Sequence, residues 1–67
     1  MNYAFAERLR NLRLELNLTQ DQVAEGVRYC RKTVIDWEMG KKLPAFDAII
    51  SLCKYFGVSA DWLLGLQ

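Results

Sequence analysis

The amino-acid sequence predicts an all-α fold. Apolar residues recur along it at spacings of three and four, which is the period of a helix that buries one face. No stretch alternates apolar with polar residues as a half-buried strand does, and short links join the periodic segments. The 67 residues, of which 52% are hydrophobic, are expected to form a single small domain over residues 1–67.

The first helix is predicted over residues 3–16. Its apolar stripe has spacings of four, three and four residues and consists of Phe5, Leu9, Leu12 and Leu16. Arg13 lies beside this stripe rather than opposite it, which places it at the edge of the predicted core.

The second helix is predicted to begin at Thr19, whose side chain can accept a hydrogen bond from a backbone N–H of the first turn. Gln22 stands three residues on, so the two residues match a capping box. Val23 and Val27 then share one face, and Gly26 is the first residue suited to end the helix.

The third helix is predicted from about residue 30 to residue 39. Its apolar stripe is narrow and consists of Val34 and Trp37, which we expect in the core. The other side of this helix carries Arg31, Lys32, Thr33, Ile35 and Asp36. Gly40 supplies a stop, and Pro44 separates this unit from the next helix.

Two more helices are predicted toward the C-terminus. The fourth covers residues 47–56, with a stripe made of Ile49, Leu52, Cys53 and Phe56, and Gly57 ends it. Ser59 caps the fifth. Trp62 and Leu66 leave more apolar surface than one short helix buries, so we expect a dimer interface there, with packing on the same domain as the alternative.

The composition argues against several classes of protein. The two cysteines, Cys30 and Cys53, form no Cys-x-x-Cys pair and there is no histidine, so we expect no metal and no cofactor. An enzyme is not expected, because paired acid and base groups near a nucleophile are absent. No apolar run approaches the length of a membrane span, and the N-terminus has charges where a signal peptide is apolar. We therefore expect a cytoplasmic protein with reduced thiols, a single disulfide being the alternative.

Basic residues are concentrated in one segment, although the net charge is only +1. Residues 28–42 contain five basic and two acidic residues, whereas the rest of the chain contains four basic and six acidic ones. Such a concentration is typical of a surface that faces a phosphate backbone. Two short helices with a tight turn and a basic loop also suit the placement of one helix in the major groove of DNA.

From Leu9 to Gly65 the sequence resembles, without a gap, the lambda-repressor-like helix-turn-helix family, the phage repressor and Cro type also called Xre. The matching stretches are Leu18-Thr19-Gln20, Val23-Ala24, Val34, Trp37-Glu38, Gly40-Lys41-Lys42, Pro44 and Phe56-Gly57-Val58-Ser59-Ala60-Asp61-Trp62-Leu63-Leu64.

The resemblance implies five helices, of which the second and third form the helix-turn-helix. It also implies that two copies of the domain, as a homodimer, read a palindromic operator in double-stranded DNA. By the same resemblance, Gln20 would anchor to a phosphate or reach an outer base, and Lys41 and Lys42 would contact phosphate from the loop after the third helix. A structural ion pair between Arg13 and Glu38 would tie the first helix to the third.

The base-reading face implied by the resemblance is made of Arg31, Lys32 and Asp36. Cys30 and Thr33 would lie at the N-terminal edge of the helix, close to the DNA backbone or to thymine methyl groups. The chemistry suits these roles, because arginine and lysine donate to guanine O6 and N7 and aspartate can accept from cytosine N4. The alternative is a face that is merely solvated, with Lys32 and Asp36 as a pair four residues apart.

Four positions depart from the family pattern, and one of them is Asp36, whose negative charge in the groove is favourable only if a donor meets it. Arg28 stands where the turn usually has glycine, and a positive φ there would cost an arginine about 1 kcal/mol; Gly26 offers an alternative site for the turn. Cys30 and Ala45 replace the usual helix caps, at a cost of about 1 kcal/mol each.

The sequence thus leads to the hypothesis of a bacterial or phage-encoded transcriptional regulator that binds specific double-stranded DNA sequences, most simply as a repressor. The alternative is a protein-interaction or antitoxin-like module that uses the C-terminal apolar surface.

Overall fold

Five helices account for most of residues 3–66, the part of the chain that the computed structural model describes. They are α1 (Tyr3–Glu15), α2 (Gln20–Val27), α3 (Arg31–Glu38), α4 (Phe46–Phe56) and α5 (Ala60–Leu63). These residues contain no strand, so the all-α prediction is confirmed. Across this same range, every helix is too short or too polar to traverse a lipid bilayer.

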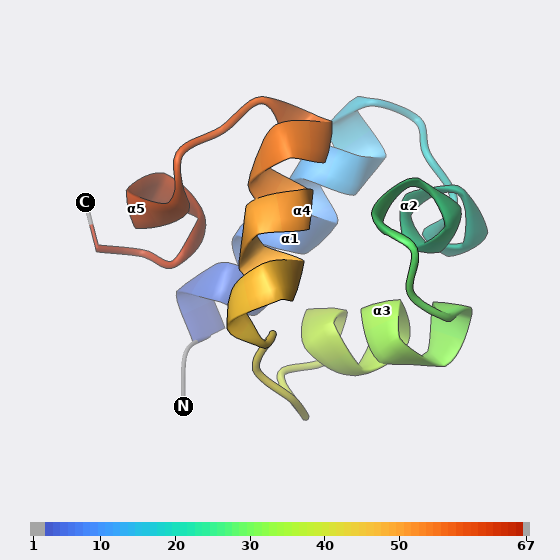
Figure 1. Ribbon diagram of the computed structural model, residues 1–67, viewed down its shortest axis with the longest axis horizontal. Coiled ribbons are helices and arrows are strands. Elements are labelled where there is room, and N and C mark those ends of the chain that lie inside the picture. Colours follow the sequence, from blue (N-terminus) through green and yellow to red (C-terminus); the bar gives the residue numbers. More distant parts are fainter. Residues whose placement is uncertain (1–2, 67) are drawn as a thin grey trace.

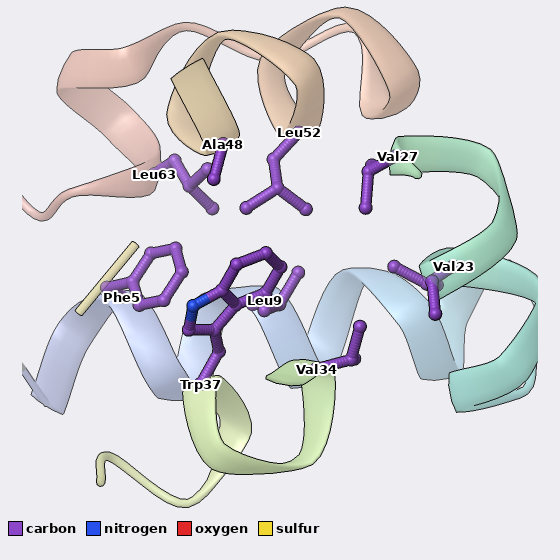
Figure 2. Packing of buried hydrophobic residues seen from close by; sticks show 10 residues of the cluster. Phe5, Leu9, Val23, Val27, Val34, Trp37, Ala48, Leu52 and Leu63 are labelled. Atoms are coloured by element: carbon purple, nitrogen blue, oxygen red, sulfur yellow. The ribbon is translucent and has the colours of Figure 1, made fainter. Parts of the chain in front are cut away.

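The helices surround one apolar cluster. Figure 2 shows α4 and α5 on one side of it, α1 and α3 on the other, and α2 at one end. In Figure 1, α2 and α3 lie together on one side of the molecule, and α5 lies on the opposite side. The two helices expected to form a helix-turn-helix are therefore adjacent, and they pack with the other three helices around the one apolar cluster.

Trp37 is the centre of the cluster, as its place on the narrow stripe of α3 predicts. Its side chain is 2% exposed and lies edge-on to the ring of Phe5, with ring centroids 6.5 Å apart (Figure 2). It also lies edge-on to the ring of Tyr29, with ring centroids 5.1 Å apart. Aromatic pairs favour this arrangement. The other fully or almost fully buried members of the cluster are Leu9, Val23, Ala24, Val27, Val34, Ala48, Leu52 and Leu63.

Backbone geometry ends all five helices in the same way. Each is followed by a residue in the left-handed region, and these residues are Asn17, Arg28, Gly40, Gly57 and Gly65. The next N–H along the chain then donates to the carbonyl oxygen five residues earlier, at 2.8–3.1 Å in every case. These bonds pair carbonyl groups that a helix end would otherwise leave unpaired.

Side chains cap the starts of the helices unevenly. The capping box predicted for α2 is present, with Gln22 N–H donating to Thr19 Oγ1 at 3.0 Å and Thr19 N–H donating to Gln22 Oε1 at 2.8 Å. Ser59 caps α5 through the N–H of Trp62 at 3.1 Å. Cys30 and Ala45 precede α3 and α4 and make no such bond, as their residue types suggest.

The predicted apolar stripe of α1 is wrong at its last position. The helix ends at Glu15, and Asn17 turns the chain with φ of 57°, which leaves Leu16 exposed. Leu18, after the turn, packs against the core instead. A helical period predicts burial only as far as the helix continues.

The end predicted for α2 at Gly26 is also wrong. The helix continues to Val27, and Arg28 takes the left-handed conformation, with φ of 65° and ψ of 42°. Gly26 has a different role, because a Cβ at this position would overlap the ring of Tyr55 on α4. Glycine here allows α4 to approach α2 closely.

The left-handed Arg28 leads to a prediction about stability. Replacing Arg28 with glycine should raise the free energy of unfolding by about 1 kcal/mol, because glycine adopts this conformation without the Cβ penalty. For a domain of this size the melting temperature should rise by about 4–8 °C. Arg28→Ala is the control, since it removes the charge and keeps the strain. An equal gain in both variants would assign the effect to the charge.

Candidate nucleic-acid interface

The outer face of α3 presents basic side chains. Val34 and Trp37 turn the opposite face into the core, and Arg31 and Lys32 are exposed on the outside. Cys30 is exposed at the start of this face, and its Sγ lies 3.1 Å from Thr33 Oγ1. The structure thus brings four of the predicted DNA-contacting residues to the N-terminal half of one short helix.

Asp36 lies beside Lys32 on this helix, but it is buried rather than exposed as its predicted place on the outer face requires. Its side chain is 7% exposed, and its carboxylate lies 3.5 Å from Lys32 Nζ and 3.8 Å from Lys42 Nζ. The helical period puts position 36 outside the core stripe. After Gly40 the chain returns to this residue, since Lys41 N–H donates to Asp36 O at 2.9 Å and Lys42 Nζ lies beside its carboxylate. A buried carboxylate is tolerated when it is paired in this way.

Arg13 and Glu38 form a two-pronged ion pair that joins α1 to α3. Arg13 Nε donates to Glu38 Oε2 at 2.6 Å, and Arg13 Nη2 donates to Glu38 Oε1 at 2.9 Å. The two side chains are 13% and 3% exposed. Hydrogen bonding to Glu38 raises the pKa of Arg13, against the effect of burial. The remaining nitrogen, Nη1, donates to Leu18 O at 3.0 Å and fixes the turn before α2.

Gln20, the predicted backbone anchor, is connected to the same pair. Its Nε2 donates to Glu38 Oε1 at 3.2 Å. Glu38 therefore receives hydrogen bonds from α1 and from the first residue of α2. This arrangement fixes the start of α2 relative to α3.

An open groove runs from the start of α2 to the outer face of α3. Its lining residues are Arg10, Arg13, Leu18, Thr19, Gln20, Asp21, Arg31, Ile35, Glu38 and Met39. Arg31 Nε lies 3.8 Å from Asp21 Oδ1 across this groove, and both side chains are exposed. Arg10 and Asp21 line this groove although neither was predicted as a site residue. Arg10 lies one helical turn before Arg13, a spacing that would have placed it here.

Lys41 and Lys42 follow α3 in an exposed loop, beside the outer face of the helix. Lys42 faces Asp36, and Lys41 is held by its backbone. Loop and helix therefore form one continuous basic surface.

The predicted dimer residues have different environments. Trp62 is half-buried, packs against the core and lies under the guanidinium of Arg8, 4.9 Å from the ring centroid. Arg8 also donates to Trp62 O. Leu66 is 71% exposed. Trp62 thus joins α5 to α1, and Leu66 is the more accessible of the two.

A short helix with a basic outer face, joined to α2 by a tight turn and to α1 by an ion pair, defines a helix-turn-helix protein. The sequence matches the helix-turn-helix domain family over residues 6–66, and the chain belongs to this family. The resemblance to lambda-repressor-like regulators is thereby confirmed.

Two curated relatives are transcriptional regulators. The chain is 40% identical over 60 residues to the HTH-type transcriptional activator BcrR of Enterococcus faecalis, a match that covers 90% of this chain and 29% of BcrR. It is 33% identical over 54 residues to the cryptic phage CTXphi transcriptional repressor RstR of Vibrio cholerae, covering 81% of this chain and 49% of RstR. The chain spans less than half the length of each of these relatives.

Solved structures share the fold. The restriction-modification controller protein C.AhdI from Aeromonas hydrophila superposes with a TM-score of 0.83 at 26% identity, over 91% of this chain and 92% of that one. The clp gene regulator ClgR from Corynebacterium glutamicum superposes with a TM-score of 0.84 at 25% identity, over 94% of this chain and 67% of that one.

The ion pair leads to a prediction about stability. Arg13→Ala should lower the free energy of unfolding by about 3–5 kcal/mol, because it leaves Glu38 buried without its partner. Thermal melting measures this loss. A double variant, Arg13→Met with Glu38→Leu, should melt closer to wild type, since it removes both charges. If Arg13→Ala melts like wild type and yet fails to bind DNA, Arg13 is a DNA contact instead.

The two cysteines should differ in reactivity. Hydrogen bonding to the side chain and backbone of Thr33 lowers the pKa of Cys30, whereas burial raises the pKa of Cys53. At neutral pH Cys30 therefore carries the larger thiolate fraction, and it is also the more exposed thiol. Iodoacetamide should alkylate Cys30 about tenfold faster or more, as measured by peptide mass spectrometry. Equal rates would contradict the described environments.

Proposed function

We propose that residues 1–67 act as the sequence-specific double-stranded DNA-binding domain of a transcriptional regulator, with α3 in the major groove. The observation that carries this proposal is the basic outer face of α3, which is held against both α1 and α2 by Glu38. Recognition by an inserted helix needs such a rigid support, because side chains must meet base edges at fixed positions.

The exposed residues divide by role. Arg31 and Lys32 read base edges, since they lie on the outer face of α3 and carry donors that suit guanine. Gln20, Lys41 and Lys42 hold the phosphate backbone on either side of the helix. Two further residues, Cys30 and Thr33, meet the backbone or thymine methyl groups at the helix start.

The assembly we propose is a homodimer on a palindromic operator. A two-fold axis in the protein would match the symmetry of two half-sites about ten base pairs apart. The exposed Leu66, four residues after Trp62, supports a contact between copies through the C-terminal surface.

The regulatory outcome we propose is repression in a bacterial or phage-infected cytoplasm. Occupation of promoter DNA is sufficient for repression. It requires that the protein bind DNA but not that it catalyse a reaction. RstR, a repressor, supports this assignment, whereas BcrR is an activator and makes activation the competing outcome. Transcription of a reporter under the selected operator, with and without the protein, separates the two.

A second candidate function is a protein-interaction or antitoxin-like module. The exposed Leu66 favours it, because large apolar side chains on a surface commonly mark contacts. Charge reversal at Arg31 and Lys32 separates the candidates, since it abolishes DNA binding but leaves a C-terminal contact intact.

Selection of bound oligonucleotides from a random pool tests the proposed DNA binding. One enriched half-site, repeated with two-fold symmetry, is the expected result. In gel shifts on this site, log K should fall linearly with log salt, and Lys41→Gln and Lys42→Gln should each reduce the slope by about 0.9. Lys54→Gln on α4 is the control and should leave the slope unchanged. Binding that is indifferent to salt and sequence contradicts the proposal.

A further inference from the structure

The buried carboxylate of Asp36 connects two exposed lysines from different segments. Lys32 belongs to α3 and Lys42 to the following loop, and their side chains are 82% and 64% exposed. Both ammonium groups nevertheless lie within 3.8 Å of the same Asp36 oxygen, Oδ2. The backbone carbonyl of Asp36 also accepts from Lys41 N–H at 2.9 Å. The basic loop is therefore attached to α3 at Asp36 in two ways. The backbone N–H of Lys41 donates to the Asp36 carbonyl oxygen, and the side chain of Lys42 pairs with the Asp36 carboxylate.

A covered carboxylate restricts its partners more than an exposed one. Its field is less screened by water, so it attracts the two ammonium groups more strongly. A free lysine samples many rotamers and loses this freedom when it binds. Each ammonium group has three N–H donors and is held beside Asp36 by charge attraction at 3.5 and 3.8 Å, so its donors remain available to DNA. The pairing thus orients the lysines before DNA arrives.

Direct base reading by Asp36 fits these observations poorly. A carboxylate that accepts from cytosine N4 must reach the base edge, whereas this side chain is 7% exposed and lies between two cations. Reaching a base would require the carboxylate to leave this buried position and its pairing with the two lysines. The charge of Asp36 also offsets one of the two positive charges beside it, which weakens attraction to DNA of any sequence.

We propose that Asp36 is a positioning residue that orients Lys32 toward the base edges and Lys42 toward the phosphate backbone, and that it sets sequence specificity without contacting a base. The inference rests on the proposed DNA-binding function. Asp36 then has two effects. It aligns the base contact of Lys32 with the phosphate contact of Lys42, and its negative charge limits binding to non-specific DNA.

Asp36→Asn tests the proposal, because it keeps the shape of the side chain and removes its charge. Binding to a random-sequence duplex should become about three- to tenfold tighter, and its salt slope should steepen by about 0.9, because a released lysine neutralises one more phosphate. The preference for the selected operator over that duplex should fall about tenfold. Glu25→Gln is the matched control, since it removes an exposed carboxylate from α2 outside the groove and should leave the operator preference unchanged.

A double variant separates positioning from direct reading. Lys32→Met should lose discrimination at one base pair of the half-site, and Asp36→Asn should weaken discrimination at the same base pair. Adding Asp36→Asn to Lys32→Met should then cause no further loss there. Asp36→Asn could instead lose discrimination at a different base pair, and lose it also when Lys32→Met is present. That result would mean that Asp36 reads a base, and it would overturn the proposal.

Folding and DNA binding are measured separately in this test. If Asp36→Asn does not fold, the variants Lys32→Met, Lys42→Met and their combination replace it, because both lysine side chains are exposed. A non-additive effect of the two substitutions on operator preference supports the proposal, and additivity overturns it. Failure of the wild-type protein to select any operator would refute the proposed function. A wild-type protein that selects an operator, with Asp36→Asn behaving like Glu25→Gln, would refute only the role of Asp36.

Discussion

Glu38 is the residue on which the arrangement of the first three helices depends. Its carboxylate, almost completely buried, receives hydrogen bonds from Arg13 on α1 and from Gln20 on α2, while its own backbone belongs to α3. Buried ion pairs add little net stability compared with apolar packing, but they permit few alternative geometries. We interpret Glu38 as the residue that fixes α3 in one orientation, while Trp37 beside it supplies the apolar contacts.

The sequence predicts the secondary structure and the core well because both depend on local rules. The capping box at Thr19 and Gln22, the stop at Gly57 and the burial of Trp37 all follow from residues within one helical turn. The predictions for Leu16 and Gly26 were wrong because neither outcome follows from local rules. The exposure of Leu16 depends on where α1 ends, and the role of Gly26 depends on Tyr55, which is distant in the sequence.

The candidate site could be predicted in outline but not in its electrostatics. The exposure of Arg31 and Lys32 follows from the helical period alone. The burial of Asp36 does not, and its contacts with Lys41 and Lys42 come from a loop that has no period. Arg10 and Asp21 were not predicted to line the groove, because the groove forms only when α1 and α2 pack beside α3.

The shared ending of the five helices bears on how this chain tolerates sequence change. Each reversal of direction is held by main-chain groups, so the identity of the turn residue matters only through its ability to adopt a left-handed conformation. Asparagine and arginine occupy two of these positions here, and glycine occupies the other three. Mutation can therefore alter the charge and size of the turns while the path of the backbone stays the same. This freedom would let related domains diverge at their surfaces without losing the common fold.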